Sequence, residues 1–168
     1  MTSLAPLGFF DLGAFYASYV GKHRRALVDS QDPRHEGVRY LDLVRGGEPA
    51  PLMAEWKPAA AFLDRVRAQL SARSPGAAIE NAYVCAFDPD GFEQWGHTPG
   101  VDLEVHVLLA PAPGFRLHSG SEAVAPAPWH ALARDPRKPG SRSNFDAPNT
   151  AHELVIELSL GAPAEVTL

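Results

Sequence analysis

The chain has 168 residues, of which 45% are hydrophobic, and this is enough to bury the core of one ordinary domain. It carries 15 Lys and Arg against 20 Asp and Glu, a net charge of -5, so no overall positive field exists to attract phosphate backbones or anionic lipid. These totals predict a single domain over 1–168 and exclude nucleic acid and a membrane surface as expected partners.

Two helices are predicted in the first part of the chain. Apolar residues recur at three- and four-residue steps over 11–27, the spacing of one helix face, with Asp11 as the N-cap. A second helix is predicted from about Pro58, a residue tolerated in a first turn, to about Arg73, where Ser-Pro-Gly ends it. The basic run over 22–25 falls at the end of the first helix, where the helix dipole favours cations, so no ligand is needed to explain it. An interfacial membrane helix at the N-terminus is the alternative for the first segment, because it is rich in aromatic residues.

The remaining predicted elements are strands. One short strand is expected over 38–44, and after residue 77 the pattern changes to strands over the ranges 78–87, 101–109, 115–118 and 152–160, with a DPDG turn following the first of these. The stretch 120–150 contains five prolines and is expected to form a long loop that is either functional or mobile. Helices early (8–76) and strands late (78–168) predict an α+β fold, in which two N-terminal helices accompany an antiparallel sheet that is open or closed into a β-barrel.

The strand VDLEVHVLL carries the candidate site. Side chains alternate across a strand, so Asp102, Glu104 and His106 share the face opposite its valines. If residues 110–114 form the loop of a hairpin, every apolar residue of the inward face meets another, and His106 lies opposite His118. Cross-strand partners have Cβ atoms about 5 Å apart, so this register gathers two imidazoles and a carboxylate around one point.

Two histidines and one carboxylate are a ligand set for Fe²⁺ or Zn²⁺. The sequence therefore predicts a divalent-metal site formed by His106, His118 and Glu104, the same three residues being the candidate catalytic groups. His152 is a further candidate ligand, as is His97, and Asp102 offers a second carboxylate. The alternative is the solvent face of an antiparallel sheet, where such residues are common.

The pattern Glu104-x-His106, followed by His118 and by PNTAHE before the terminal strand, resembles the ligand-bearing strands of the cupin superfamily. That resemblance implies a small β-barrel that holds a metal on histidines and a carboxylate. It departs from the first cupin motif, which has a His-x-His pair and a following glutamate, whereas this chain has Glu104 first and Ala110-Pro111 near the place of the glutamate. The likeness covers about a third of the chain, and it brings His106, His118 and His152 forward as ligands.

Other chemistry finds less support. Cys85 cannot form an internal disulfide and has apolar neighbours, which predicts a buried, unreactive thiol and a reducing, cytoplasmic compartment. No Gly-x-Ser-x-Gly elbow and no Gly-rich phosphate loop occur.

Two functions of different classes follow. The first is a small cytoplasmic domain whose metal site assists hydrolysis or oxygenation of a small-molecule substrate. The second is a non-catalytic interaction module, an adaptor, assembly component or immunity-type protein, that holds a protein partner through the stretch 120–150 and its strand edges. The sequence leaves open whether the chain is an enzyme and whether it forms a homodimer.

Overall fold

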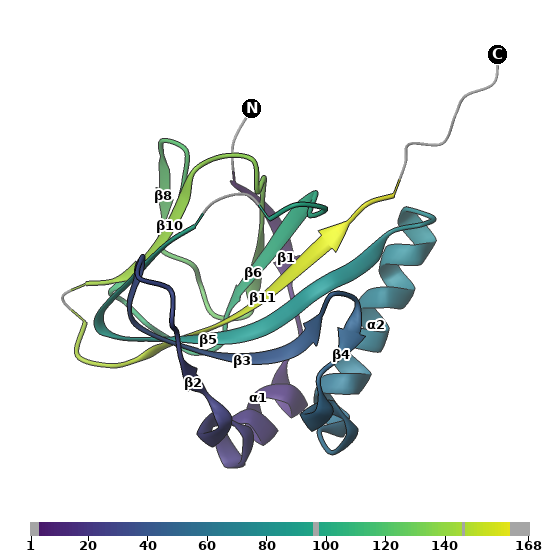
Figure 1. Cartoon of the computed structure of the whole chain (residues 1–168), viewed down its shortest axis with the longest axis horizontal. Helices are drawn as coiled ribbons and strands as arrows, with labels where there is room; N and C mark the ends of the chain where they lie inside the picture. The colour runs from purple at the N-terminus through teal and green to yellow at the C-terminus, as the bar shows by residue number, and fades with distance from the viewer. Residues whose placement is uncertain (1–3, 96–97, 146, 162–168) are drawn as a thin grey trace.

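The computed structural model describes residues 4–95, 98–145 and 147–161 and shows a strongly curved antiparallel sheet with helices against one side (Figure 1). The helices are α1 (Gly13–Gly21) and α2 (Lys57–Arg73), with 3-10 turns η1 (His23–Ala26) and η2 (Pro51–Ala54). The strands are β1 (Leu4–Phe9), β2 (Val28–Asp29), β3 (His35–Arg45), β4 (Glu48–Pro49), β5 (Ala78–Trp95), β6 (Leu103–Leu108), β7 (Phe115–Ser119), β8 (Glu122–Val124), β9 (His130–Arg134), β10 (Gly140–Asn144) and β11 (Ala151–Ser159).

The strand order confirms the predicted fold class. Neighbouring strands follow β1-β9-β6-β11-β5-β10-β7-β8, and β3 pairs with the other edge of β5 and carries β2 and β4. All of these pairings are antiparallel. The sheet curls into a nearly closed barrel, and with the two N-terminal helices the fold is α+β.

Strand β5 continues through the DPDG sequence, where the sequence had predicted a turn. Its first part pairs with β11 and its last four residues pair with β10, so it passes from one layer of the barrel to the other. The bend is built by a positive φ of 64° at Asp90 and by close approach of two glycines. A Cβ on Gly91 would lie 2.7 Å from the carbonyl oxygen of Gly37, so the strands meet there only because both residues lack side chains.

The two faces of the main layer have different partners. The valine face of β6 packs with β11, β5 and the helices in one hydrophobic core, as the alternation predicted. Trp56 is fully buried in that core, its ring is stacked on Phe15 at 4.9 Å between centroids, and its Nε1 donates to Ser18 Oγ at 2.7 Å. The opposite face of β6 is turned into the barrel.

Both helices occupy the predicted regions. Helix α2 matches its prediction within a residue, whereas α1 ends at Gly21 and the basic run continues as the 3-10 turn η1. The N-cap of α1 is Leu12 and not Asp11 as predicted, because the helix begins one residue later than expected; Asp11 Oδ1 still accepts a hydrogen bond from the backbone N–H of Gly13 at 3.1 Å. Over the described residues, no helix is long and apolar enough to cross a bilayer.

The stretch 120–150 is not the long loop that its prolines predicted. It contains β8, β9 and β10; four of the prolines lie between these strands, and Pro148 lies between β10 and β11. Each strand has three to five residues, which is short enough to fit between proline interruptions, so composition averaged over the stretch hid them. β1 was not predicted either; it pairs with β9.

Candidate functional site

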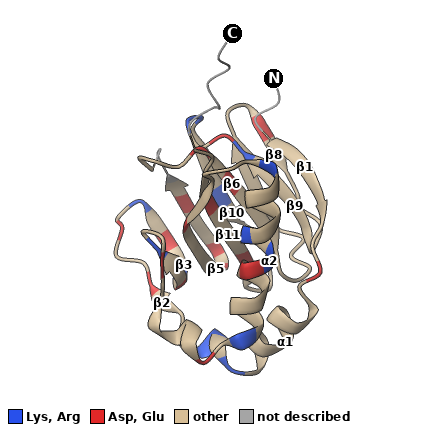
Figure 2. Ribbon diagram, turned by 90° about the vertical axis from the view of Figure 1, so that its right-hand side faces the viewer, with Lys and Arg blue, Asp and Glu red and all other residues tan. Residues whose placement is uncertain are grey.

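Strand register places a row of polar side chains across the inside of the barrel. Glu104 on β6 is paired with Arg134 on β9 and with Glu157 on β11, and Glu157 is in turn paired with Asn81 on β5. Side chains at paired positions share a face, so all four point into the barrel. Glu104 and Arg134 are each 1% exposed. Charged segments within the strands are visible in Figure 2.

His106 lies between two carboxylates. Its Nε2 is 3.1 Å from Oε2 of Glu104, two residues earlier on β6, and its Nδ1 is 3.2 Å from Oε1 of Glu153. Glu153 is the diagonal neighbour, because His106 pairs directly with Val155 on β11. The ring is 2% exposed, so both contacts are shielded from water.

Arginines from two other strands complete the cluster. Arg134 Nη1 donates to Glu104 Oε2 at 2.6 Å. Arg142 on β10 donates from Nη1 to Glu153 and from Nη2 to Glu93 Oε1 at 2.8 Å. Its guanidinium carbon lies 5.2 Å from the centre of the Phe87 ring. The fork of Arg142 therefore joins the two layers of the barrel through two carboxylates.

The buried cluster is balanced in charge when His106 is protonated. Three carboxylates, those of Glu93, Glu104 and Glu153, then face one imidazolium and two guanidinium groups. Burial alone would lower the pKa of His106, but the adjoining carboxylates outweigh it and raise that pKa. Burial would raise the pKa of Glu104, but its contacts with His106 and Arg134 lower it to about 2. We infer that both ring nitrogens of His106 donate to carboxylates.

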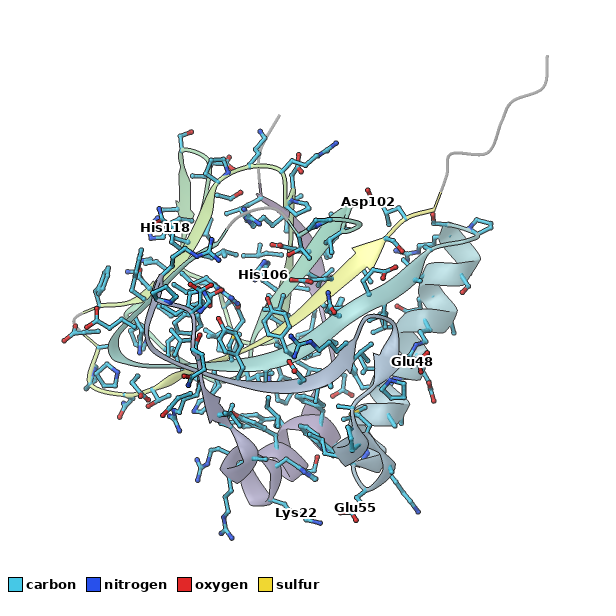
Figure 3. The ribbon with its side chains drawn as sticks, in the orientation of Figure 1. Lys22, Glu48, Glu55, Asp102, His106 and His118 are labelled. Atoms are coloured by element: carbon cyan, nitrogen blue, oxygen red, sulfur yellow. The ribbon has the colours of Figure 1, made fainter. Side chains whose placement is uncertain are left out.

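The cross-strand pairing predicted for the two histidines is wrong. β6 pairs with β9 and β11, whereas β7 pairs with β8 and β10, so no hairpin joins β6 and β7. His106 is inside the barrel, and His118 is paired with Ser141 and Ala123 and is half-buried (Figure 3). The predicted register matched the apolar faces of two consecutive strands, which is valid only when those strands are neighbours in the sheet. In this fold other strands lie between β6 and β7.

The other predicted ligands also lie apart from His106. His152 is on the helix-facing side, and its Nδ1 is 2.7 Å from the hydroxyl of Tyr19 on α1. Asp102 is exposed, and its Oδ2 accepts from the backbone N–H of Leu160 at 2.9 Å. His97 lies outside the described residues. Glu104 and His106 are therefore the only members of the predicted set that the described structure brings together.

The donor set around His106 does not fit a divalent metal. A histidine ligand needs a free nitrogen lone pair, whereas both nitrogens of His106 are directed at carboxylates. Those carboxylates are in turn paired with Arg134 and Arg142, whose positive charges would oppose a cation. Within 4–95, 98–145 and 147–161, no group of three or more His, Cys, Asp or Glu residues is placed to hold a metal ion.

A cavity of about 770 Å³ opens beside this cluster. Its lining includes Tyr40, Asn81, Tyr83 and Glu157 from the inner face of the barrel. Glu157 is 6% exposed and accepts from Asn81 Nδ2 at 2.7 Å. Tyr40 donates to Glu93, so the cavity wall is directly bonded to the charged cluster. Burial raises the pKa of Glu157, and the charge of Glu104 raises it further.

Sequence reasoning missed most of this cluster. Glu153 and Glu157 occur among apolar residues in HELVIEL. Polar residues within an apolar strand are the signal that identified Glu104 and His106, and the same signal could have identified these two glutamates. Arg134 and Arg142 lie on short strands in the proline-rich stretch, which carries no comparable alternation.

Comparisons with solved structures identify the fold. The chain is similar to a 2OG-Fe(II) oxygenase family oxidoreductase from Burkholderia pseudomallei (TM-score 0.65, 14% identity, 95% of this chain and 85% of that chain covered). It is also similar to a prolyl-4-hydroxylase from Pseudomonas putida (0.63, 11%, 95% and 93%) and to SnoN, a non-heme alpha-ketoglutarate dependent epimerase from nogalamycin biosynthesis (0.64, 13%, 99% and 86%). These likenesses show a double-stranded β-helix, a cupin-like fold. No protein-family model matches the chain, and no curated protein matches it.

Proposed function

We propose that the chain binds a small amine- or hydroxyl-bearing molecule in the cavity beside the charged cluster. The observation that carries this proposal is the lining of the 770 Å³ cavity, whose volume is in the range of small-molecule sites. Three carboxylates, those of Asp29, Asp42 and Glu157, line it against one guanidinium, that of Arg45. Arg45 is itself 3.4 Å from Asp42.

The remaining polar groups of the lining support the same chemistry. Two tyrosine hydroxyls and the side chains of Ser30, Gln31 and Asn81 accompany the carboxylates. Carboxylates accept hydrogen bonds from ammonium and hydroxyl groups, and an anionic ligand would meet like charge. The fold provides the context, because the double-stranded β-helix is shared with enzymes that act on small molecules, such as the epimerase named above.

A matched pair of variants tests this proposal. Asp42 and Asp64 are both exposed and both form an i,i+3 ion pair with an arginine, at 3.4 Å and 3.1 Å, but only Asp42 lines the cavity. We expect isothermal titration with amines, amino sugars and polyols to find a ligand whose affinity falls about tenfold in Asp42→Asn and is unchanged in Asp64→Asn, since one charge-assisted hydrogen bond is lost. Equal affinities in both variants, or preference for a dicarboxylate, would overturn the proposal.

Metal-assisted oxygenation is the second candidate, and the fold likeness favours it. It requires ligands other than the His106 cluster. Anaerobic Fe²⁺ titration of the full chain and of His106→Ala tests this second candidate. Stoichiometric binding by the wild type that persists in His106→Ala supports a metal site elsewhere in the chain. Absence of Fe²⁺ binding counts against metal-assisted oxygenation.

A protein-interaction module remains the alternative of another class. Leu7 and Phe9 on the edge strand β1 are 47% and 61% exposed. Light scattering with size-exclusion chromatography measures whether the chain is a monomer, and a stable homodimer lost in Phe9→Ser would favour this alternative.

A further inference from the structure

A second cavity, on the helix-facing side of the sheet, gathers arginines that are far apart in the sequence. It has a volume of about 500 Å³ and is lined by Arg24, Arg25, Arg39, Thr150 and His152. Arg24 and Arg25 belong to η1 and Arg39 to β3, whereas Thr150 directly precedes β11 and His152 is its second residue. Figure 2 shows basic segments gathered at this end of the molecule, beside α1.

Strand register builds the floor of this cavity. Ala86 on β5 is paired with Arg39 on one side and with His152 on the other, so the three side chains stand in one row on the same face. The small methyl group of Ala86 between two long side chains leaves a hollow. This placement is a property of the sheet and does not depend on surface side-chain rotamers.

The guanidinium groups at the cavity have spare hydrogen-bonding capacity. Arg24 and Arg25 make no ion pair with any residue in the described ranges. Arg39 Nη2 donates to Asp88 Oδ1 at 2.8 Å, but its Nε is buried and has no partner among the described residues. Asp88 also accepts from Thr150 Oγ1 at 3.3 Å. One carboxylate thus faces three guanidinium groups.

The positive charge around this cavity affects the pKa of His152. Burial lowers its pKa, and the charges of Arg24 and Arg39 lower it further, to about 4. The ring is therefore neutral at pH 7. A Tyr19 hydroxyl that donates to Nδ1 leaves the Nε2–H as the donor of this ring.

We propose that this cavity binds a small molecule through a phosphoryl group, a site that goes beyond the proposed function. A phosphoryl group presents three terminal oxygens and a charge near -2, which matches several guanidinium forks, whereas a carboxylate satisfies one. The cavity volume exceeds that of inorganic phosphate and leaves room for an organic part. The net charge of -5 disfavours a polyanion as the source, because a nucleic acid would approach an acidic molecule.

Titration with phenyl phosphate, inorganic phosphate and succinate, at constant ionic strength and pH 7.5, tests the proposal on the full chain. We expect saturable binding of both phosphates, weaker binding of succinate, and a shift of the His152 ring resonances on phosphate addition. Loss of Arg24 and Arg25 in the double variant R24Q/R25Q should weaken phosphate binding at least tenfold, because two charge-assisted contacts are removed.

The controls keep loss of binding separate from loss of folding. Arg24 and Arg25 are exposed, so the double variant should unfold at the wild-type temperature. Arg73→Gln removes an exposed positive charge at the end of α2 and should leave phosphate affinity unchanged. Arg39→Lys keeps the charge but loses the fork, and should bind more weakly than the wild type. No saturable binding, or equal binding in R24Q/R25Q, would overturn the site; succinate binding as tight as phenyl phosphate would overturn the phosphoryl assignment.

Discussion

The Nε2 atom of His106 lies 3.1 Å from Oε2 of Glu104, and both side chains are at least 98% buried inside the barrel. Replacing His106 by alanine removes one of three positive charges from a balanced cluster and leaves a void. We expect His106→Ala to lower the free energy of unfolding by about 3 kcal/mol, because breaking a buried ion pair from one side leaves charge uncompensated. Urea denaturation followed by circular dichroism measures it.

His118→Ala is the matched control for this variant. His118 is half-buried and belongs to a strand that does not pair with β6, so its loss should change stability by about 0.5 kcal/mol or less. A similar large loss in both variants would contradict the assignment of His106 to a separate buried cluster.

Two histidines make the free energy of unfolding depend on pH in opposite directions. The pKa of His106 is raised in the folded state above its ordinary value of 6.5, so its contribution is complete below pH 6.5 and is lost as pH rises through the folded pKa. The pKa of His152 is lowered to about 4, so its contribution is complete above pH 6.5 and is lost as pH falls toward 4. The joint contribution of these two histidines to the free energy of unfolding should therefore be largest near pH 6.5.

Single variants separate these two slopes. His106→Ala should remove the fall above pH 6.5, and His152→Gln should reduce the fall between pH 6.5 and 4. The carboxylate of Glu104, with its pKa lowered from 4.5 to about 2 by His106 and Arg134, adds a further loss below pH 4.5; this loss should persist in His152→Gln and be smaller in His106→Ala, which removes one of those two partners. Denaturation curves across pH 3 to 9 measure the profiles; a His106→Ala profile that keeps the alkaline slope would show that another group titrates there.

Local sequence patterns predicted where the helices and strands of this fold lie better than they predicted which strands pair with each other. Burial of one face sets both the helical spacing of apolar residues over 57–73 and their alternation in β6. The sequence therefore predicted helix α2 and the buried valine face of β6 correctly. Strand partners depend on the path of the whole sheet. Consecutive β6 and β7 lie in different layers, and the cross-strand contact of His106 therefore comes from Glu153 on β11, 47 residues away. No short-range signal in the sequence contains that information.

Gly140 at the start of β10 makes room for Arg134. A Cβ at this position would lie 2.4 Å from Arg134 Nη2, and the guanidinium cannot retreat because it donates to Glu104 and to the carbonyl oxygen of Lys138. We expect Gly140→Ala to cost about 1–3 kcal/mol through overpacking. Thermal and urea unfolding measure it. Gly21→Ala, where a Cβ meets nothing within 4 Å, is the control and should be neutral or slightly stabilising.

The bend of β5 depends on Gly91 in a different way, because the obstacle is backbone. A Cβ there would lie 2.7 Å from the carbonyl oxygen of Gly37 and 2.8 Å from that of Asp88. Both obstacles are backbone atoms at the point where the pairing of β3 with β5 shifts register, so a Cβ fits only if the backbone of this irregularity moves. Gly91→Ala should therefore cost more than Gly140→Ala and should also separate Glu93 from Arg142, since Glu93 follows the bend by two residues. Hydrogen exchange of β10 amides measures this loosening: faster exchange in Gly91→Ala than in Gly140→Ala is expected, and unchanged exchange would show that the layer crossing does not need the glycine contact.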